Sequence, residues 1–475
     1  MLDRLESLIS NSADADYAEA RYHARTVSEV SFVNGRLERI KMSENAGCGI
    51  RVLVDGCWGF SSTSDVSAEG LKGSLASALS MARVLAGSKK KKVAGLAESR
   101  MARGRFEPPV RGRLADISIE QKVKVTKEAQ AAAKKANSLI KTASASYRDM
   151  LDYKAIANSD GASVEIFDSK PEFNVVAIAR SGGGGRGGGG GQQEESATAH
   201  EGVGITGGWD DLFGKKGHLE FAHEAADKAA KLLKAKHATG EKTTIILDPG
   251  MVGLLCHEAV GHTVEADFVL SGSVVKDRMG QKVASELVTL VDSGLSDIAG
   301  NAAGTIGIDD EGVEAGRTEI IRDGVLRSFL HGRESAFEFG TASTGNARAF
   351  TYSDEPLIRM RNTYIEPRSD RLDDMIRETR HGYLVRGARN GQADANGEFM
   401  FGAQEAYLIE NGEVKELLRG ASISGNAFEV LQSIDMVGNE FEYDIGTGYC
   451  GKYQPAKVDG GGPHVRCTAV IGGVQ

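Results

Sequence analysis

The sequence contains few cysteines and no long run of apolar residues. Its five cysteines in 475 residues are odd in number and show no paired spacing, which argues against a disulfide framework. A reducing, cytoplasmic setting is therefore expected. No stretch of 18 apolar residues occurs, so no membrane span is expected. The first residues also lack the basic and then apolar pattern of a secretory signal.

An excess of positive charge is also missing. There are 57 lysines and arginines against 66 aspartates and glutamates, a formal net charge of −9. This balance argues against general nucleic-acid binding. A run of four lysines at residues 89–92 could indicate a nucleic-acid or membrane patch, but the acidic total favours a solvated helix end.

Glycine, by contrast, is abundant, with 60 residues, and indicates many tight turns and close backbone contacts. It is concentrated in residues 181–191, broken by Arg186, which predicts a loop. The pattern of a phosphate-binding P-loop is absent there. The length predicts two or three domains. We divide the chain into an N-terminal domain, 1–238, which contains this loop, and a C-terminal domain, 239–475.

The N-terminal half combines helical and strand patterns, so we predict an α+β domain with antiparallel strands. Asn34-Gly35 and Asp55-Gly56 each separate two apolar strand patterns, which is typical of tight hairpins. Four short strands are predicted near residues 138–147, 153–158, 162–168 and 173–180. Helical spacing predicts helices near residues 2–9, 68–86, 118–137 and 219–236.

The C-terminal half begins with an apolar strand at residues 243–247, followed by a helix from about Met251. After that helix come short strand patterns separated by glycine, asparagine and aspartate, as at Asp323-Gly324 and Asn411-Gly412. We predict an antiparallel β-sheet or a partly open barrel that carries one buried helix.

That helix contains His257, Glu258 and His262, and the two histidines are five positions apart, at i and i+5. Neutral imidazole is a good metal ligand. In a regular α-helix, positions i and i+5 point about 140° apart and could not share an ion. A wide turn with i→i+5 hydrogen bonds would bring them nearly into line. We therefore predict a π-bulged or locally unwound helix, with Gly261 as the place where glycine tolerates the distortion.

A catalytic zinc site would need a third ligand. Glu265 and Asp267 are close in the chain, and Cys450 lies in a predicted glycine-flanked turn about 190 residues away. The alternative is that both histidines cap or pack a core, and that Cys450 is a small inert core residue. The residues alone leave both interpretations open.

These residues, with others along nearly the whole chain, resemble the TldD/PmbA family of peptidases, the TldD branch in particular. The resemblance is carried by the helix motif from His257 and by the following segments: Asp309-Asp310-Glu311-Gly312, Thr344-Gly345-Asn346, Arg361-Asn362-Thr363-Tyr364, Glu405-Ala406-Tyr407-Leu408-Ile409, Met436-Val437-Gly438-Asn439 and Cys450-Gly451-Lys452. Further on, three glycines and Pro463 precede His464, and we interpret His464 as a surface or turn residue.

The resemblance implies Zn²⁺ bound by His257, His262 and Cys450, with Glu258 as the catalytic acid/base. Glu265 and Asp267 are candidates for the acceptors that orient the histidine rings. The implied activity is hydrolysis of extended or unfolded peptides by a homodimer, or by a heterodimer with a TldE/PmbA-like paralogue. Two rival interpretations are a non-catalytic TldE-like partner without metal, and a nucleotide or nucleic-acid binder that uses the glycine loop and the lysine run.

Overall fold

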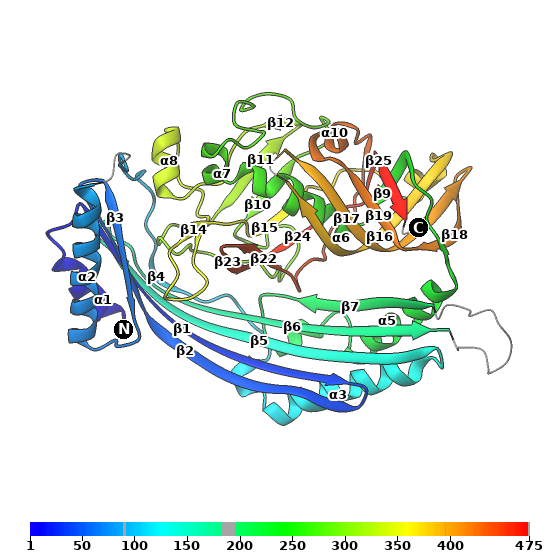
Figure 1. Cartoon of the computed structure of the whole chain (residues 1–475), viewed down its shortest axis with the longest axis horizontal. Coiled ribbons are helices and arrows are strands. Elements are labelled where there is room, and N and C mark those ends of the chain that lie inside the picture. The colour runs from blue at the N-terminus through cyan, green and yellow to red at the C-terminus, as the bar shows by residue number, and fades with distance from the viewer. Residues whose placement is uncertain (89–91, 182–194, 395, 474–475) are drawn as a thin grey trace.

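The computed structural model describes residues 1–88, 92–181, 195–394 and 396–473 (Figure 1). The predicted glycine-rich loop, apart from Ser181, and the lysines at 89–91 lie outside the described residues. The predicted α+β class is confirmed. A layer of long curved strands with helices forms the N-terminal half, and the C-terminal half packs over the concave side of these strands.

The N-terminal half is built on a seven-stranded sheet in the order β3-β2-β1-β5-β6-β4, with β7 also paired to β6. Asn34 and Asp55 have positive φ angles at the two predicted hairpin turns, as these tight turns require. The strands are β1 (Tyr17–Val33), β2 (Arg36–Val54), β3 (Cys57–Thr63), β4 (Arg103–Phe106), β5 (Ile140–Asn158), β6 (Ser163–Arg180) and β7 (Ser196–Gly204).

The four short strands predicted between residues 138 and 180 are in fact two long ones, β5 and β6. The prediction broke them at charged positions, which resemble loop sequence. In the fold, these charges are neutralised within the sheet layer. Asp149 pairs with Lys122 at 2.6 Å, and Asp152 pairs with Arg25 at 2.7 Å. Since buried charges are tolerated when they are paired, the strand continues through them.

Helices cover this sheet in two groups. The first group packs α3 and α5 against β5 and β6, and the second packs α1 and α2 against the other end of the sheet. Ser67 and Ser118 cap their helices by accepting hydrogen bonds from the backbone N–H groups of Gly70 and Gln121. The helical segments of this half are α1 (Leu2–Ser10), α2 (Ala68–Ala86), the 3₁₀ turn η1 (Leu114–Asp116), α3 (Ile119–Ala136), α4 (Trp209–Leu212) and α5 (His218–Lys234).

The C-terminal half contains a ring of five strands. The strands β16, β9, β25, β19 and β17 pair in this order, and β17 pairs back with β16. Most pairs are antiparallel, as predicted, but β9 and β16 are parallel. The sheet comprises β8 (Lys236–His237), β9 (Glu241–Leu247), β16 (His381–Ala393), β17 (Glu398–Glu410), β18 (Glu413–Arg419), β19 (Ala421–Asn426), β20 (Met436–Val437) and β25 (Val465–Gly473).

A second sheet of six strands, in the order β12-β11-β10-β15-β24-β21, faces this ring. Its members are β10 (Leu290–Ser293), β11 (Arg317–Arg322), β12 (Val325–Leu326), β15 (Asn362–Ile365), β21 (Glu442–Tyr443) and β24 (Asp459–Gly462). Two separate hairpins are formed by β13 (Ala347–Arg348) with β14 (Leu357–Ile358), and by β22 (Tyr449–Lys452) with β23 (Gln454–Lys457).

The predicted buried helix lies between the ring and the second sheet, because its residues contact β16 and β17 on one side and β15 and β24 on the other. Met251, Val252 and Leu255 are fully buried in the common core. The helical segments of this half are α6 (Pro249–Leu254), η2 (Leu255–Gly261), η3 (His262–Val264), α7 (Ala266–Leu270), α8 (Arg333–Phe339), α9 (Leu372–Arg377) and α10 (Ala427–Gln432).

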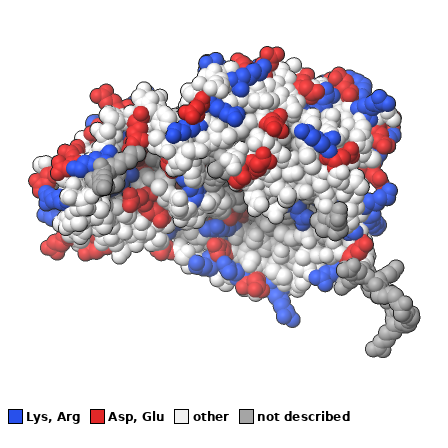
Figure 2. Space-filling view, turned by 45° about the horizontal axis from the view of Figure 1, so that its top comes forward, with Lys and Arg blue, Asp and Glu red and all other residues white. Residues whose placement is uncertain are grey.

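The surface carries both signs of charge. On the face drawn in Figure 2, lysines and arginines are interspersed with aspartates and glutamates. Among the described residues, no helix combines the length and the apolar character needed to cross a membrane.

Buried ion pairs join the two halves. Asp310, from the C-terminal half, accepts hydrogen bonds from Lys154 Nζ of β5 at 2.7 and 3.0 Å, and Arg21 Nε of β1 lies 3.6 Å away. Burial raises the pKa of the Asp310 carboxyl, but the positive charges of Lys154 and Arg21 outweigh it and lower that pKa to about 2. The ordinary value for aspartate is about 3.9. Asp310 therefore stabilises the fold above about pH 4, and this contribution is lost as the pH falls towards 2.

We expect Asp310→Asn to lower the free energy of unfolding by about 3 kcal/mol at neutral pH, because it leaves two buried cations without their anion. The difference in the free energy of unfolding between the variant and the wild type should become smaller as the pH falls from 4 towards 2. Denaturant unfolding curves at several pH values measure this. A difference that is constant over this pH range would contradict the role given to Asp310.

Candidate metal centre

The helix that carries the two histidines is a π-helix, η2, over Leu255–Gly261, as the spacing of the motif predicts. The backbone N–H of His262 donates a hydrogen bond to the carbonyl oxygen of His257, an i→i+5 bond. The two imidazole rings consequently lie on one side of the helix, with their centroids 5.3 Å apart. A regular α-helix would have turned them away from each other.

Gly261 has a different role from the predicted one. Its backbone angles, φ −55° and ψ −47°, are ordinary helical values, so conformational freedom is not needed. A β-carbon at this position would lie 1.8 Å from Sδ of the fully buried Met360. Glycine is required here because Met360 packs directly on the helix backbone.

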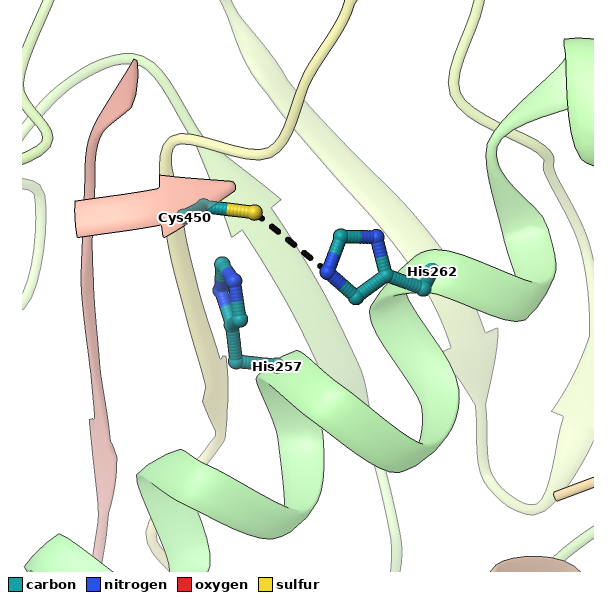
Figure 3. A group of neighbouring side chains, drawn as sticks. All are labelled: His257, His262 and Cys450. Atoms are coloured by element: carbon teal, nitrogen blue, oxygen red, sulfur yellow. Dashed lines mark hydrogen bonds between the residues drawn. The ribbon is translucent and has the colours of Figure 1, made fainter. Parts of the chain in front are cut away.

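Cys450 meets the two histidines from the opposite side (Figure 3). Its Sγ lies 3.3 Å from His262 Nε2, and the ligand atoms of His257, His262 and Cys450 all lie within 4.8 Å of one another. The predicted glycine-flanked turn is instead strand β22, and the apex of its hairpin is Tyr453, which has a positive φ angle. Cys450 therefore extends from a paired strand towards the π-helix.

The donor set fits a metal ion. His257 is 2% exposed, and neither of its ring nitrogens has a hydrogen-bond partner among the residues that the structure describes. Buried polar atoms are normally paired, because desolvation without a partner is costly. Two imidazoles and one thiol also form a ligand set that suits zinc. A cation bound between them would provide the partner that His257 lacks.

The electrostatics of the cluster favour a thiolate. Burial raises the pKa of the Cys450 thiol, but the neighbouring His257 and His262 reverse this and lower it to about 4. Burial likewise lowers the pKa of His262, whereas its hydrogen bonds to Cys450 and Glu265 raise it to about 10. The two shifts act in the same sense and favour a thiolate at Cys450.

Glu258 lies beside this cluster at the wall of a cleft. Its Oε2 is 3.8 Å from His262 Nε2, and its side chain remains 29% exposed. Glu258, His257 and Cys450 all line a cavity of about 580 Å³. Residues of β7 and α5 form one wall of the cavity, and residues of β16 and β17 form the other. The carboxylate is thus accessible from the space in which a ligand can bind.

The two nearby acidic residues have different surroundings. Glu265 is fully buried, and its Oε2 lies 2.9 Å from His262 Nδ1. Since a carboxylate only accepts, Nδ1 donates, which leaves Nε2 of His262 facing the sulfur. Asp267 instead accepts a hydrogen bond from Lys452 at 2.8 Å. His464 follows β24, is not among the described residues that line the cleft, and has its pKa lowered to about 4, mainly by burial.

The motif around Cys450 contains one more residue that is linked to the cluster through a carboxylate. Lys452 was part of the recognised pattern, but its role could not be assigned from sequence. Its ammonium group lies 3.3 Å from Glu265 Oε2, so it contacts the same carboxylate as His262. Arg359, whose guanidinium donates to the carbonyl oxygen of Cys450 at 2.7 Å, carried no sequence signal at all.

Fold and cluster together describe a candidate metalloprotein, in which a deformed helix and a distant strand bring three side chains that could hold a metal ion to the wall of a cleft. Family models described as PmbA/TldA metallopeptidase domain 1, central domain and C-terminal domain match residues 18–82, 112–233 and 239–472. The chain therefore belongs to the TldD/PmbA family.

Individual relatives agree with this. The chain is 34% identical to a protein of Methanothermobacter thermautotrophicus named "Metalloprotease", over 99% of both chains. It is 27% identical to a "Zinc metalloprotease TldD homolog" of Saccharolobus solfataricus, over 97% of both. The crystal structure of TldE from Thermococcus kodakarensis has the same fold, with a TM-score of 0.77 and 20% identity over 99% of this chain and 100% of that one.

We expect Gly261→Ala to destabilise the protein by about 1–3 kcal/mol, because the added methyl group overpacks against Met360. Met360→Ala removes the clash. The double variant should therefore be more stable than the sum of the single changes predicts, by about 1 kcal/mol or more. Thermal or denaturant unfolding of the four proteins gives this coupling. Strictly additive effects would show that Met360 does not require the glycine.

Proposed function

We propose that this protein is a zinc-dependent peptidase. The proposal is supported above all by one observation: His257, His262 and Cys450 converge at the wall of a cleft, with the accessible carboxylate of Glu258 beside them. The relatives' names, which include metalloprotease and zinc metalloprotease, support the same class of activity.

His257, His262 and Cys450 would hold the ion. When bound, zinc supplies Lewis acidity that polarises a peptide carbonyl and lowers the pKa of coordinated water. Glu265 keeps the Nδ1 proton on His262, so that Nε2 is the ligating nitrogen. The pKa of Cys450, lowered to about 4, keeps its sulfur deprotonated at neutral pH.

Glu258 is the proposed acid/base of the reaction. It follows the ligand His257 directly in the π-helix and faces the cleft, so a substrate in the cleft comes within its reach. We assign it two steps, removal of a proton from the attacking water and delivery of that proton to the leaving amine. Both steps need a carboxylate that solvent and substrate can approach, which its 29% exposure permits.

The proposed substrates are extended or unfolded peptides. The cleft is bordered by β7, the outer strand paired to β6, and by the β16–β17 hairpin. A peptide in this space can add as a strand and use main-chain hydrogen bonds, which gives little side-chain preference. We further propose that the protein acts as a homodimer or as a heterodimer with a TldE/PmbA-like paralogue, which the family resemblance implies. No role in nucleic-acid or membrane binding is proposed.

A cytoplasmic location is proposed on chemical grounds. All five cysteines are free and buried. A thiolate ligand such as Cys450 persists where the environment keeps thiols reduced.

The alternative function is that of a non-catalytic, TldE-like partner chain. This alternative has the same fold but binds no metal. Zinc analysis of the purified protein separates the two, because a stoichiometric ion is expected only for the peptidase.

We expect Glu258→Gln to retain zinc and lose peptide hydrolysis, with a decrease of at least about 10²-fold in kcat, since it removes the general base but none of the ligands. Hydrolysis of an unfolded protein, followed by mass spectrometry, measures the activity, and metal analysis confirms the loading. Wild-type activity in a fully loaded variant would exclude Glu258 as the base.

Cys450→Ala should lower zinc affinity, because a two-histidine site lacks the third ligand of known catalytic zinc centres. Dialysis against a chelator, followed by metal analysis, provides the measurement, with Cys467→Ala as a control. Cys467 is a buried cysteine of β25 whose pKa burial raises to about 12. Zinc retention equal to that of the wild type would remove Cys450 from the site.

A further inference from the structure

The hairpin that carries Cys450 is not part of either large sheet. Strands β22 and β23 pair only with each other among the described strands. A larger sheet reaches the hairpin through the chain, which continues from Lys457 into β24 at Asp459. Buried cations make further contacts with the hairpin. Arg348 donates to the carbonyl oxygen of Lys457 at 2.6 Å, and two other cations lie nearer to Cys450.

Arg359 is one of these cations. It is fully buried, and it has no carboxylate partner among the ion pairs of the described residues. Its guanidinium donates to the carbonyl oxygens of Cys450 at 2.7 Å and of Gln454 at 2.5 Å, and lies 3.4 Å from that of Lys452. Burying a cation without an anion is costly. These carbonyl dipoles are what compensate it, so the guanidinium and the hairpin fix each other.

Lys452 is the second cation, and it belongs to strand β22 of the hairpin itself. Its Nζ donates to the carbonyl oxygen of Ile358 at 3.0 Å and to Asp267 at 2.8 Å, and lies 3.3 Å from Oε2 of Glu265. The same oxygen of Glu265 accepts from His262. One buried carboxylate thus connects the hairpin to the helix that holds both imidazoles.

The short segment of residues 358–360 brings these contacts together. The carbonyl group of Ile358 binds Lys452, the side chain of Arg359 binds the hairpin, and the side chain of Met360 packs on Gly261 just before His262. Three consecutive residues therefore contact both the hairpin of Cys450 and the helix of the two histidines.

We propose that Arg359 is a positioning residue for Cys450, which holds the hairpin so that the sulfur meets His257 and His262, and that Lys452 supports the same alignment through Glu265. The inference rests on the proposed zinc site. It assigns no contact between Arg359 and substrate. Without Arg359, the two histidines still lie together on the π-helix, but the sulfur is no longer held opposite them.

The test compares Arg359→Lys with Arg361→Lys. Both arginines are fully buried and two residues apart, and both use a forked guanidinium to hold carbonyl oxygens. The acceptors of Arg361 are Asp292, Thr344 and Gly345, none of which lies in the hairpin. Lysine keeps the charge at each position but cannot replace the fork, so only Arg359→Lys loses contacts to the hairpin.

Each protein is stripped with a chelator and titrated with Co²⁺, whose thiolate-to-metal absorption reports the sulfur directly, and zinc affinity is measured by competition with a chromophoric chelator. We expect Arg359→Lys to lose most of the thiolate absorption and to bind zinc roughly 10- to 100-fold more weakly. Arg361→Lys should resemble the wild type in both measurements. Thiolate absorption and affinity in Arg359→Lys equal to those of the wild type would overturn the assignment.

The wild type and Cys450→Ala are titrated in parallel. If the Co²⁺-loaded wild type shows no thiolate absorption, the proposed zinc site is wrong and the inference fails with it. If the wild type and Arg359→Lys show the same thiolate absorption, only the positioning role of Arg359 is wrong. If Arg359→Lys does not fold, Lys452→Met is tested in its place. Reduced thiolate absorption in this variant supports the proposal that the buried cations hold the sulfur opposite the histidines. Thiolate absorption and zinc affinity equal to those of the wild type overturn the proposal.

Discussion

One hydrogen bond organises the site, the i→i+5 bond from the backbone N–H of His262 to the carbonyl oxygen of His257. It widens a single helical turn, and the two imidazoles face the same way only because of it. The turn is confined between a ring of strands and a second sheet, where Met360 leaves no room for a side chain at Gly261. Packing from outside the helix therefore requires glycine at position 261.

Buried charges stabilise the contacts between the two halves and between the hairpin and the helix. Asp310 joins the halves through Lys154 and Arg21, and Lys452 joins the hairpin to Glu265. Each of these groups would be costly to bury alone, and each is compensated by a charged or strongly polar partner. The same rule explains why strand β5 continues through Asp149 and Asp152, where its sequence resembles a loop. These ion pairs fix specific residues of the two halves, and of the hairpin and the helix, against each other, which non-directional hydrophobic packing does not do.

Much of this could be predicted from local patterns, and the exceptions have physical reasons. Helices α2 and α3 and the hairpin turns at Asn34 and Asp55 depend on neighbouring residues, so their positions were predicted correctly. The π-helix followed from the spacing of two histidines. The pairing of Cys450 with them came from family resemblance, since no local rule joins residues so far apart. Arg359 and the fit of Met360 on Gly261 depend on tertiary contacts, which no periodicity records.

The sulfur and the nearest imidazole are 188 positions apart in the chain. A ribosome adding roughly 5 to 20 residues per second needs about 10 to 40 seconds to cover that distance. For this interval the nascent chain carries both histidines but not the cysteine of the proposed ligand set. In the proposed peptidase, the growing polypeptide, itself extended and unfolded, would therefore meet no complete metal site until the hairpin of β22 and β23 has been made.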